Sequence, residues 1–159
     1  MKEMDIIKRL YSQFLRHRQC IAAVHHNMNM LDYCGESDFI AVTRAGMIHE
    51  VEVKVSRSDF KADLKKVNRH LHLSGKGVTI TSPYRGEQHE RLAERRPNYF
   101  WYAAPYGLIK VEELPPYAGL IEVGDFMPQR KSAPRIHSKN LWDDRMKQAM
   151  LTSLSYKWV

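Results

Sequence analysis

The order of helical and extended patterns along the chain predicts a mixed α/β domain, in the broad sense that includes α+β folds. Three observations predict it: an amphipathic helix over residues 2–18, a β-hairpin over 38–55 and a second helix over 58–72, with further strands behind them. The chain has 159 residues. That length fits one domain, 1–159, with an apolar core that needs neither metal nor disulfide for stability.

The N-terminal helix is predicted from the spacing of its apolar residues. Met4, Ile7, Tyr11 and Phe14 recur every three or four residues and therefore share one face of a helix. Residues 21–25 follow as a candidate strand.

A hairpin is the clearest local pattern. The runs DFIAVT (38–43) and MIHEVEVKV (47–55) are rich in β-prone residues, and Arg44-Ala45-Gly46 between them suits a tight turn. With a three-residue turn, Asp38 lies opposite Glu52, which places their Cβ atoms about 4.5–5.5 Å apart.

One helix and several short strands are predicted after the hairpin. Phe60, Leu64, Val67 and Leu71 have helical spacing and predict a continuous helix over 58–72. Short β-prone runs between Pro and Gly turns predict the strands Val78–Thr81, Tyr99–Ala103, Leu108–Glu112 and Leu120–Val123. An apolar stripe from Trp142 to Leu154 predicts a C-terminal helix.

The charge balance favours a polyanionic partner. Lys and Arg number 25 against 18 Asp and Glu, a net charge of +7, and such a field attracts nucleic acid. No apolar run is long enough to span a membrane or to act as a secretory signal, so a cytoplasmic protein is expected. Both cysteines, Cys20 and Cys34, are expected to be reduced thiols, since neither has zinc-site spacing.

Three ionisable side chains share one face of the second hairpin strand. Side chains alternate along a strand, so Glu50, Glu52 and Lys54 point the same way, with Asp38 facing them. Two carboxylates about 5 Å apart repel by about 3 kcal/mol at an effective dielectric near 20, and a divalent cation relieves that repulsion. The alternative is a solvated strand face on which these groups are surface charges.

The same residues resemble a known nuclease motif. Asp38, followed 14 residues later by Glu52-Val53-Lys54, resembles the signature of the PD-(D/E)xK nuclease superfamily. The segments VEVKVSRSDFKADLKK and NYFWYAAPYGLIKVEELPPYAGLIEV resemble small bacterial and phage members linked to DNA repair or phage DNA metabolism, and the resemblance covers about residues 36–137. It implies a restriction-endonuclease-like αβββαβ core, with a central mixed sheet flanked by helices.

The resemblance also implies an activity and a site. It implies hydrolysis of DNA phosphodiester bonds with Mg²⁺, for which Mn²⁺ can substitute, and no small-molecule cofactor. Asp38, Glu52 and the backbone carbonyl of Val53 match the metal ligands, and Lys54 matches the catalytic lysine. Two alternatives stay open: a catalytically silent DNA-binding or accessory protein on the same fold, and a small RNA-binding protein. Relatives often form homodimers, so a homodimer is a further expectation.

Further residues are assigned supporting roles. Glu50 and Lys66 are secondary site candidates, and Lys61, Lys65 and Arg69 are expected to contact the DNA backbone. Glu3 matches poorly the first-helix glutamate that many members use. The histidines lack paired metal-ligand spacing and are expected to be structural or superficial.

Overall fold

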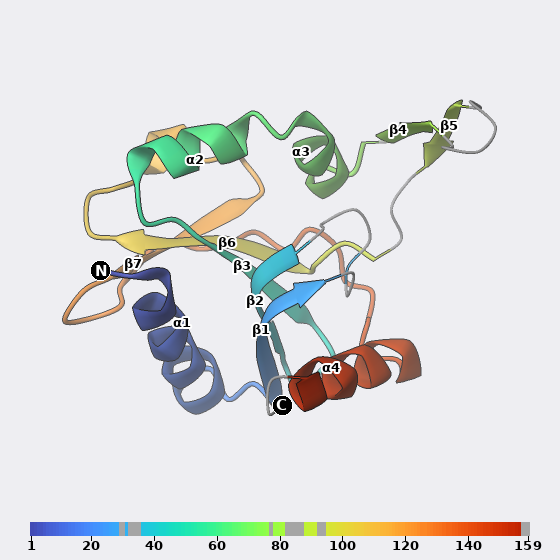
Figure 1. Ribbon diagram of the computed structural model, residues 1–159, viewed down its shortest axis with the longest axis horizontal. Coiled ribbons are helices and arrows are strands. Elements are labelled where there is room, and N and C mark those ends of the chain that lie inside the picture. Colours follow the sequence, from blue (N-terminus) through green and yellow to red (C-terminus); the bar gives the residue numbers. More distant parts are fainter. Residues whose placement is uncertain (29–30, 32–35, 77, 82–87, 92–94, 157–159) are drawn as a thin grey trace.

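The structure is a computed structural model that describes residues 1–28, 31, 36–76, 78–81, 88–91 and 95–156. At its centre is a six-stranded mixed sheet in the order β1-β2-β3-β6-β7-β8 (Figure 1). Its strands are β1 (Ala22–Met28), β2 (Glu36–Val42), β3 (Ile48–Val53), β6 (Tyr99–Pro105), β7 (Ala118–Val123) and β8 (Gln129–Lys131). The first three are antiparallel neighbours, β6 and β7 run parallel to β3, and β8 is antiparallel to β7.

Helices cover both faces of this sheet. The helices are α1 (Glu3–Tyr11), continued by a π-helical segment (Ser12–His17), α2 (Arg57–Leu64), α3 (Val67–Leu73) and α4 (Asp144–Tyr156). Figure 1 shows α1 and α2 on opposite sides of the sheet. A separate pair of strands, β4 (Val78–Thr81) and β5 (Gln88–Arg91), lies in the connection between α3 and β6. The predicted mixed α/β class is therefore confirmed.

Alternation along β2 divides the core between the two faces. Phe39 and Ala41 pack with Ile6 and Leu10 of α1. The intervening residues Ile40 and Val42 pack with Met146 and Met150 of α4. A third cluster joins Phe60 of α2 to Phe100, Tyr102 and Leu120 of β6 and β7. All of β3 is buried, so its charged residues Glu50 and Glu52 lie in a dry environment, whereas β2 is exposed at its first residue, Glu36.

The hairpin has the predicted register. Phe39 pairs with Val51 and Ile40 with Glu50, and the N–H of Thr43 donates to the carbonyl of Met47 at 2.9 Å to close the turn. Gly46 takes the left-handed conformation, with φ of 75°, that glycine adopts most easily. The short turn fixes the pairing and therefore the face of every side chain on both strands.

The prediction of one continuous helix over 58–72 is wrong. It is interrupted at Lys66, whose ψ of 74° is not helical, and α3 starts afresh at Val67. Val67, expected on the buried stripe, has 64% of its surface exposed. The interruption rotates α3 relative to α2, and this rotation directs Arg69 into the protein.

Two other predictions differ from the structure. The strand predicted over Leu108–Glu112 is replaced by a turn after Pro105 and a 3₁₀ helix over Val111–Glu113. The Glu113 carboxylate accepts a hydrogen bond from the N–H of Lys110, which caps this short helix. Cys20 is a buried free thiol, as expected, whereas Cys34 lies outside the described residues. In the described part of the chain no helix combines the length and apolar composition that a membrane crossing requires.

Candidate active site

Asp38 and Glu52 are neighbours at the end of the hairpin. The ladder that pairs Phe39 with Val51 continues by one step to Asp38 and Glu52, on the same face as Ile40 and Glu50. Burial, and after it repulsion from the Glu52 carboxylate, raises the pKa of Asp38 to about 7. The two acids therefore lie close enough for the charge of one to oppose ionisation of the other.

The main chain of Val53 also faces Asp38. Its N–H donates to Oδ2 of Asp38 at 2.7 Å. In an extended strand the N–H and the C=O of one residue point to the same side, so the Val53 carbonyl also points toward β2. Asp38 thus has both Glu52 and the Val53 main chain beside it.

Lys54 follows β3 and is almost completely buried. Its side chain is 4% exposed, and its Nζ lies 2.8 Å from Oε1 of Glu52, 3.5 Å from Oδ1 of Asp63 and 3.8 Å from Oδ1 of Asp59. Burial on its own would lower the pKa of Lys54, but Glu52 first and then Asp63 and Asp59 raise it above its ordinary value. The amine is therefore a fixed positive charge at neutral pH.

Arg69 reaches the same carboxylates from α3. Its Nη2 lies 2.9 Å from Oε1 of Glu50 and 2.8 Å from Oε2 of Glu52. The Glu50 carboxylate also accepts a hydrogen bond from the hydroxyl of Ser37 at 2.8 Å. Burial raises the pKa of Glu50, and Arg69 acts against that rise. Glu50 is consequently held within an internal network.

The surface role predicted for Arg69 does not fit this geometry. Arg69 is 6% exposed, and two carboxylates bind its guanidinium. Lys61 and Lys65, the other predicted DNA contacts, are exposed on α2 and at its C-terminal end. Lys66 lies at the interruption between the helices, about half exposed, with Nζ 3.1 Å from Oδ1 of Asp63. A cationic surface next to Lys54 therefore involves these lysines and not Arg69.

Asp63 links the buried cations to the sheet. Its Oδ2 accepts a hydrogen bond from the Tyr102 hydroxyl at 2.6 Å. Burial would raise the pKa of Asp63, but the Tyr102 hydrogen bond, then Lys54 and Arg69, lower it overall. No local sequence pattern indicates this contact, because Tyr102 lies 39 residues from Asp63 in the chain.

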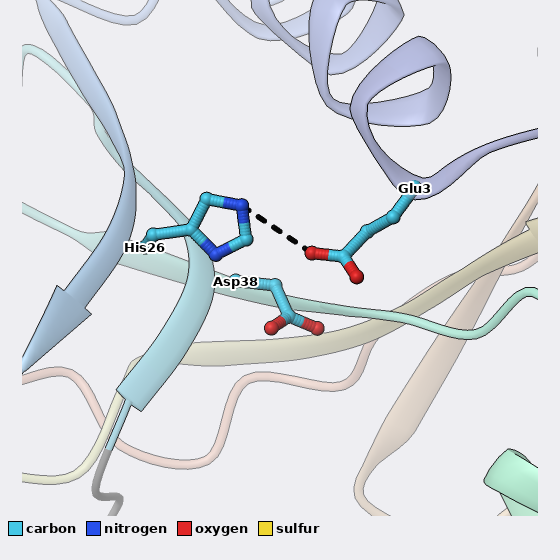
Figure 2. Close-up of side chains that lie close together, drawn as sticks. All are labelled: Glu3, His26 and Asp38. Carbon is cyan, nitrogen blue, oxygen red and sulfur yellow. Dashed lines mark ion pairs between the residues drawn. The ribbon is translucent and has the colours of Figure 1, made fainter.

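A second group of ligand atoms meets Asp38 from the other side. One ligand atom each of Glu3, His26 and Asp38 lies within 4.8 Å of the others (Figure 2). Nε2 of His26 lies 3.3 Å from Oε1 of Glu3, and its Nδ1 lies 3.2 Å from Oε1 of Glu36. Two carboxylates and an imidazole are donors that a divalent cation accepts, so this group can hold one.

The sequence does not indicate this group clearly. Glu3 is the first residue of α1 and matched the family pattern poorly, yet the packing of α1 brings its carboxylate to Asp38. His26 has a φ of 46°, within the left-handed region. His25 and His26 are consecutive, but both reach toward α1, where His25 hydrogen-bonds the hydroxyl of Tyr11 at 2.8 Å. In a regular strand consecutive side chains point to opposite faces, so this irregularity of the backbone aims His26 at the site.

Comparison with known proteins adds information about the fold. No family model matches the chain, and no curated protein matches it. A solved structure of a protein of unknown function from Silicibacter pomeroyi is similar, with a TM-score of 0.63 and 18% sequence identity. The match covers 99% of this chain and 90% of that chain. At this identity, the likeness shows a shared overall fold and nothing about chemistry.

Proposed function

We propose that the protein is a metal-dependent nuclease that hydrolyses DNA phosphodiester bonds, with a site of the PD-(D/E)xK type. The observation that carries the proposal is the convergence of Asp38, Glu52 and Lys54 at one end of the hairpin. The element order also supports it. Along the chain α1, β1, β2, β3, the α2–α3 pair and β6 follow the expected αβββαβ order, with β6 parallel to β3.

The donor set at this site fits a hard divalent cation. Asp38, Glu52 and the Val53 carbonyl would hold Mg²⁺ or Mn²⁺, because such ions take carboxylate and carbonyl oxygens and keep several waters. When bound, the ion would lower the pKa of a water and offset charge on a phosphate oxygen. Burial, and after it the Glu52 carboxylate, raises the pKa of Asp38, and a bound cation would favour its ionised form.

Lys54 would act through its charge. Its pKa is raised, so the ammonium does not serve as a general base at neutral pH. It would instead orient the attacking water and stabilise the negative charge that develops on the phosphate. Its contacts with Glu52 and Asp63 hold the ammonium in position before substrate arrives. Such preorganisation is the main way in which a buried charge assists a reaction.

The surroundings of the site favour a polyanion. The net charge is +7, and the exposed Lys61, Lys65 and Lys66 lie on the helix that directly follows Lys54 or just after it. Exposed lysines that neutralise phosphates give an affinity that falls steeply with salt. A DNA backbone crossing this part of the surface would therefore meet the site from the side of α2.

A cleavage assay tests the proposal. The purified protein is incubated with plasmid, single-stranded and branched DNA in Mg²⁺, in Mn²⁺ and in EDTA. We expect cleavage of at least one substrate with metal and none in EDTA. Lys54→Ala should reduce the rate by about 10²-fold or more, as loss of a preorganised charge does. Lys147→Ala, an exposed lysine on α4 away from the α2 lysines, is the control and should keep the rate within a few fold.

One observation favours the silent alternative and makes the assay informative. Both oxygens of Glu52 are already held, Oε1 by Lys54 and Oε2 by Arg69. These two cations compete with a metal ion for the Glu52 carboxylate. A protein in which they keep Glu52 from the ion would bind DNA without cleaving it. DNA binding with no cleavage under any metal would therefore overturn the nuclease proposal in favour of the accessory role.

A further inference from the structure

The geometry around His26 points to a particular class of metal. We propose that His26 and Glu3 join Asp38 as ligands, so that the site selects a divalent transition metal such as Mn²⁺ over Mg²⁺. This inference rests on the proposed function, because it names the cofactor of the same site. The imidazole of His26 is the new ligand, because the motif formed by Asp38 and Glu52-Val53-Lys54 contains no histidine.

The three side chains come from three separate elements. Glu3 begins α1, His26 lies in β1 and Asp38 lies in β2 (Figure 2). Asp38 stands between the two halves of the site, with Glu52 on the β3 side and His26 on the β1 side. The pairs His25–Phe39 and Asn27–Ser37 flank the position where His26 faces Asp38. The register therefore places His26 opposite Asp38, and the left-handed backbone at His26 directs its imidazole toward Glu3 and Asp38.

The competing contacts differ between the two halves. Buried cations hold the Glu52 carboxylate at both oxygens. The His26 and Glu3 side chains, in contrast, are 33% and 43% exposed, and the ion pair between them is 3.3 Å long. Partly exposed ligands can exchange an ion pair for a metal with less loss than a dry network can. Glu3 and His26 can therefore complete the coordination of an ion that Asp38 holds.

Ligand chemistry then determines which ion is preferred. Mg²⁺ is bound mainly by oxygen atoms and waters, whereas imidazole suits first-row transition metals. An imidazole nitrogen in place of a carboxylate oxygen should lower the affinity for Mg²⁺ more than the affinity for Mn²⁺. The hydrogen bond between Nδ1 of His26 and Glu36 orients the ring so that Nε2 faces Glu3, and a metal ion held by both residues would replace their direct contact. A second hydrogen bond of this kind is common for metal-binding histidines.

The test measures Mn²⁺ binding by the full chain directly, without DNA. Loss of the free Mn²⁺ signal in electron paramagnetic resonance gives the affinity, and pulsed measurements detect a ¹⁴N nucleus bonded to the ion. His26→Asn is the informative variant, because asparagine tolerates the left-handed backbone at this position. His17→Gln, an exposed histidine at the end of the π-helical segment, is the control. Circular dichroism confirms that each variant folds.

We expect one bound Mn²⁺ with ¹⁴N coupling in the wild type and in His17→Gln, with millimolar Mg²⁺ a poor competitor. His26→Asn should lose the coupling and bind Mn²⁺ about 10–100-fold more weakly, with little change in Mg²⁺ affinity. Mn²⁺ bound without ¹⁴N coupling, or unchanged in His26→Asn, would overturn the role of His26 and leave the proposed function standing. A DNA cleavage assay reports on the proposed function separately, so a nitrogen-coordinated but inactive protein would refute only the nuclease.

Discussion

Glu52 and Lys54 form an ion pair with 2.8 Å between Oε1 and Nζ, and both side chains are almost closed to solvent. A buried pair of this kind gives little net stability, because both charges lose their hydration. Its effect is geometric, since it fixes the ammonium at one point. Arg69 and Asp63 carry the remaining charges of this network and balance the buried pair. Removal of either residue should therefore lower the stability of the folded protein.

Arg69→Met should destabilise the folded protein. The change leaves the buried carboxylates of Glu50 and Glu52 without their shared cation, a kind of loss that typically reduces the free energy of unfolding by about 3–5 kcal/mol. Urea denaturation monitored by circular dichroism measures it. Lys61→Met, on the exposed side of α2, is the control and should stay within about 0.5 kcal/mol of wild type. A variant of normal stability but weakened DNA binding would instead restore the surface role predicted for Arg69.

Tyr102→Phe should also lower stability, by a smaller amount. It removes the hydroxyl that donates to Oδ2 of Asp63, and a hydrogen bond to a charged group contributes about 1.5–3 kcal/mol. Thermal unfolding at pH 7 gives the difference. Tyr106→Phe is a matched control, because its hydroxyl is at the surface and donates to the carbonyl of Phe126. If both substitutions lowered stability equally, the hydrogen bond to Asp63 would contribute no more than the surface hydrogen bond of Tyr106.

Asp38→Asn should stabilise the metal-free protein while removing metal binding. Because burial and Glu52 raise the pKa of Asp38 from 3.8 to about 7, its ionised form is disfavoured by folding. The sign follows: this penalty is absent below about pH 4, grows as pH rises toward 7 and is complete above it. We expect a gain of about 1–3 kcal/mol at pH 8 in EDTA that disappears near pH 4. A variant less stable than wild type at pH 8 would contradict this account.

The hairpin shows what local sequence pattern can predict. A three-residue turn with Gly46 and strict alternation fix the register, so the approach of Asp38 to Glu52 follows from residues within one short stretch. The mixed α/β class follows from the order of helical and extended patterns. The parallel pairing of β3 with β6 does not, because the predicted strand Val78–Thr81 lies between them in the sequence and pairs with β5 in a separate sheet.

The rest of the site depends on packing between distant segments. The interruption at Lys66 turns Arg69 inward, and the helical spacing of Phe60 and Leu64 contains no sign of it. The left-handed backbone at His26 aims a second consecutive histidine at α1, which strict alternation would exclude. Glu3, at the start of α1, reaches Asp38 only because α1 packs on the sheet. These features arise from tertiary contacts, which override local preference.

His49→Gln should reduce the acid sensitivity of the fold. His49 is buried, stacks on Tyr99 with ring centroids 4.6 Å apart, and accepts a hydrogen bond from the indole N–H of Trp101 at 3.0 Å. Burial, and after it the charge of Arg18, lowers its pKa from 6.5 to about 3. Between these values the unfolded chain binds a proton that the folded chain rejects, so stability is complete above pH 6.5 and falls as pH drops toward 3, by up to about 1.4 kcal/mol per pH unit. Glutamine keeps an acceptor but cannot titrate. Urea unfolding at matched pH values from 3.5 to about 7 should therefore show wild type losing stability faster than the variant on acidification, whereas parallel curves would mean that His49 is protonated equally in both states.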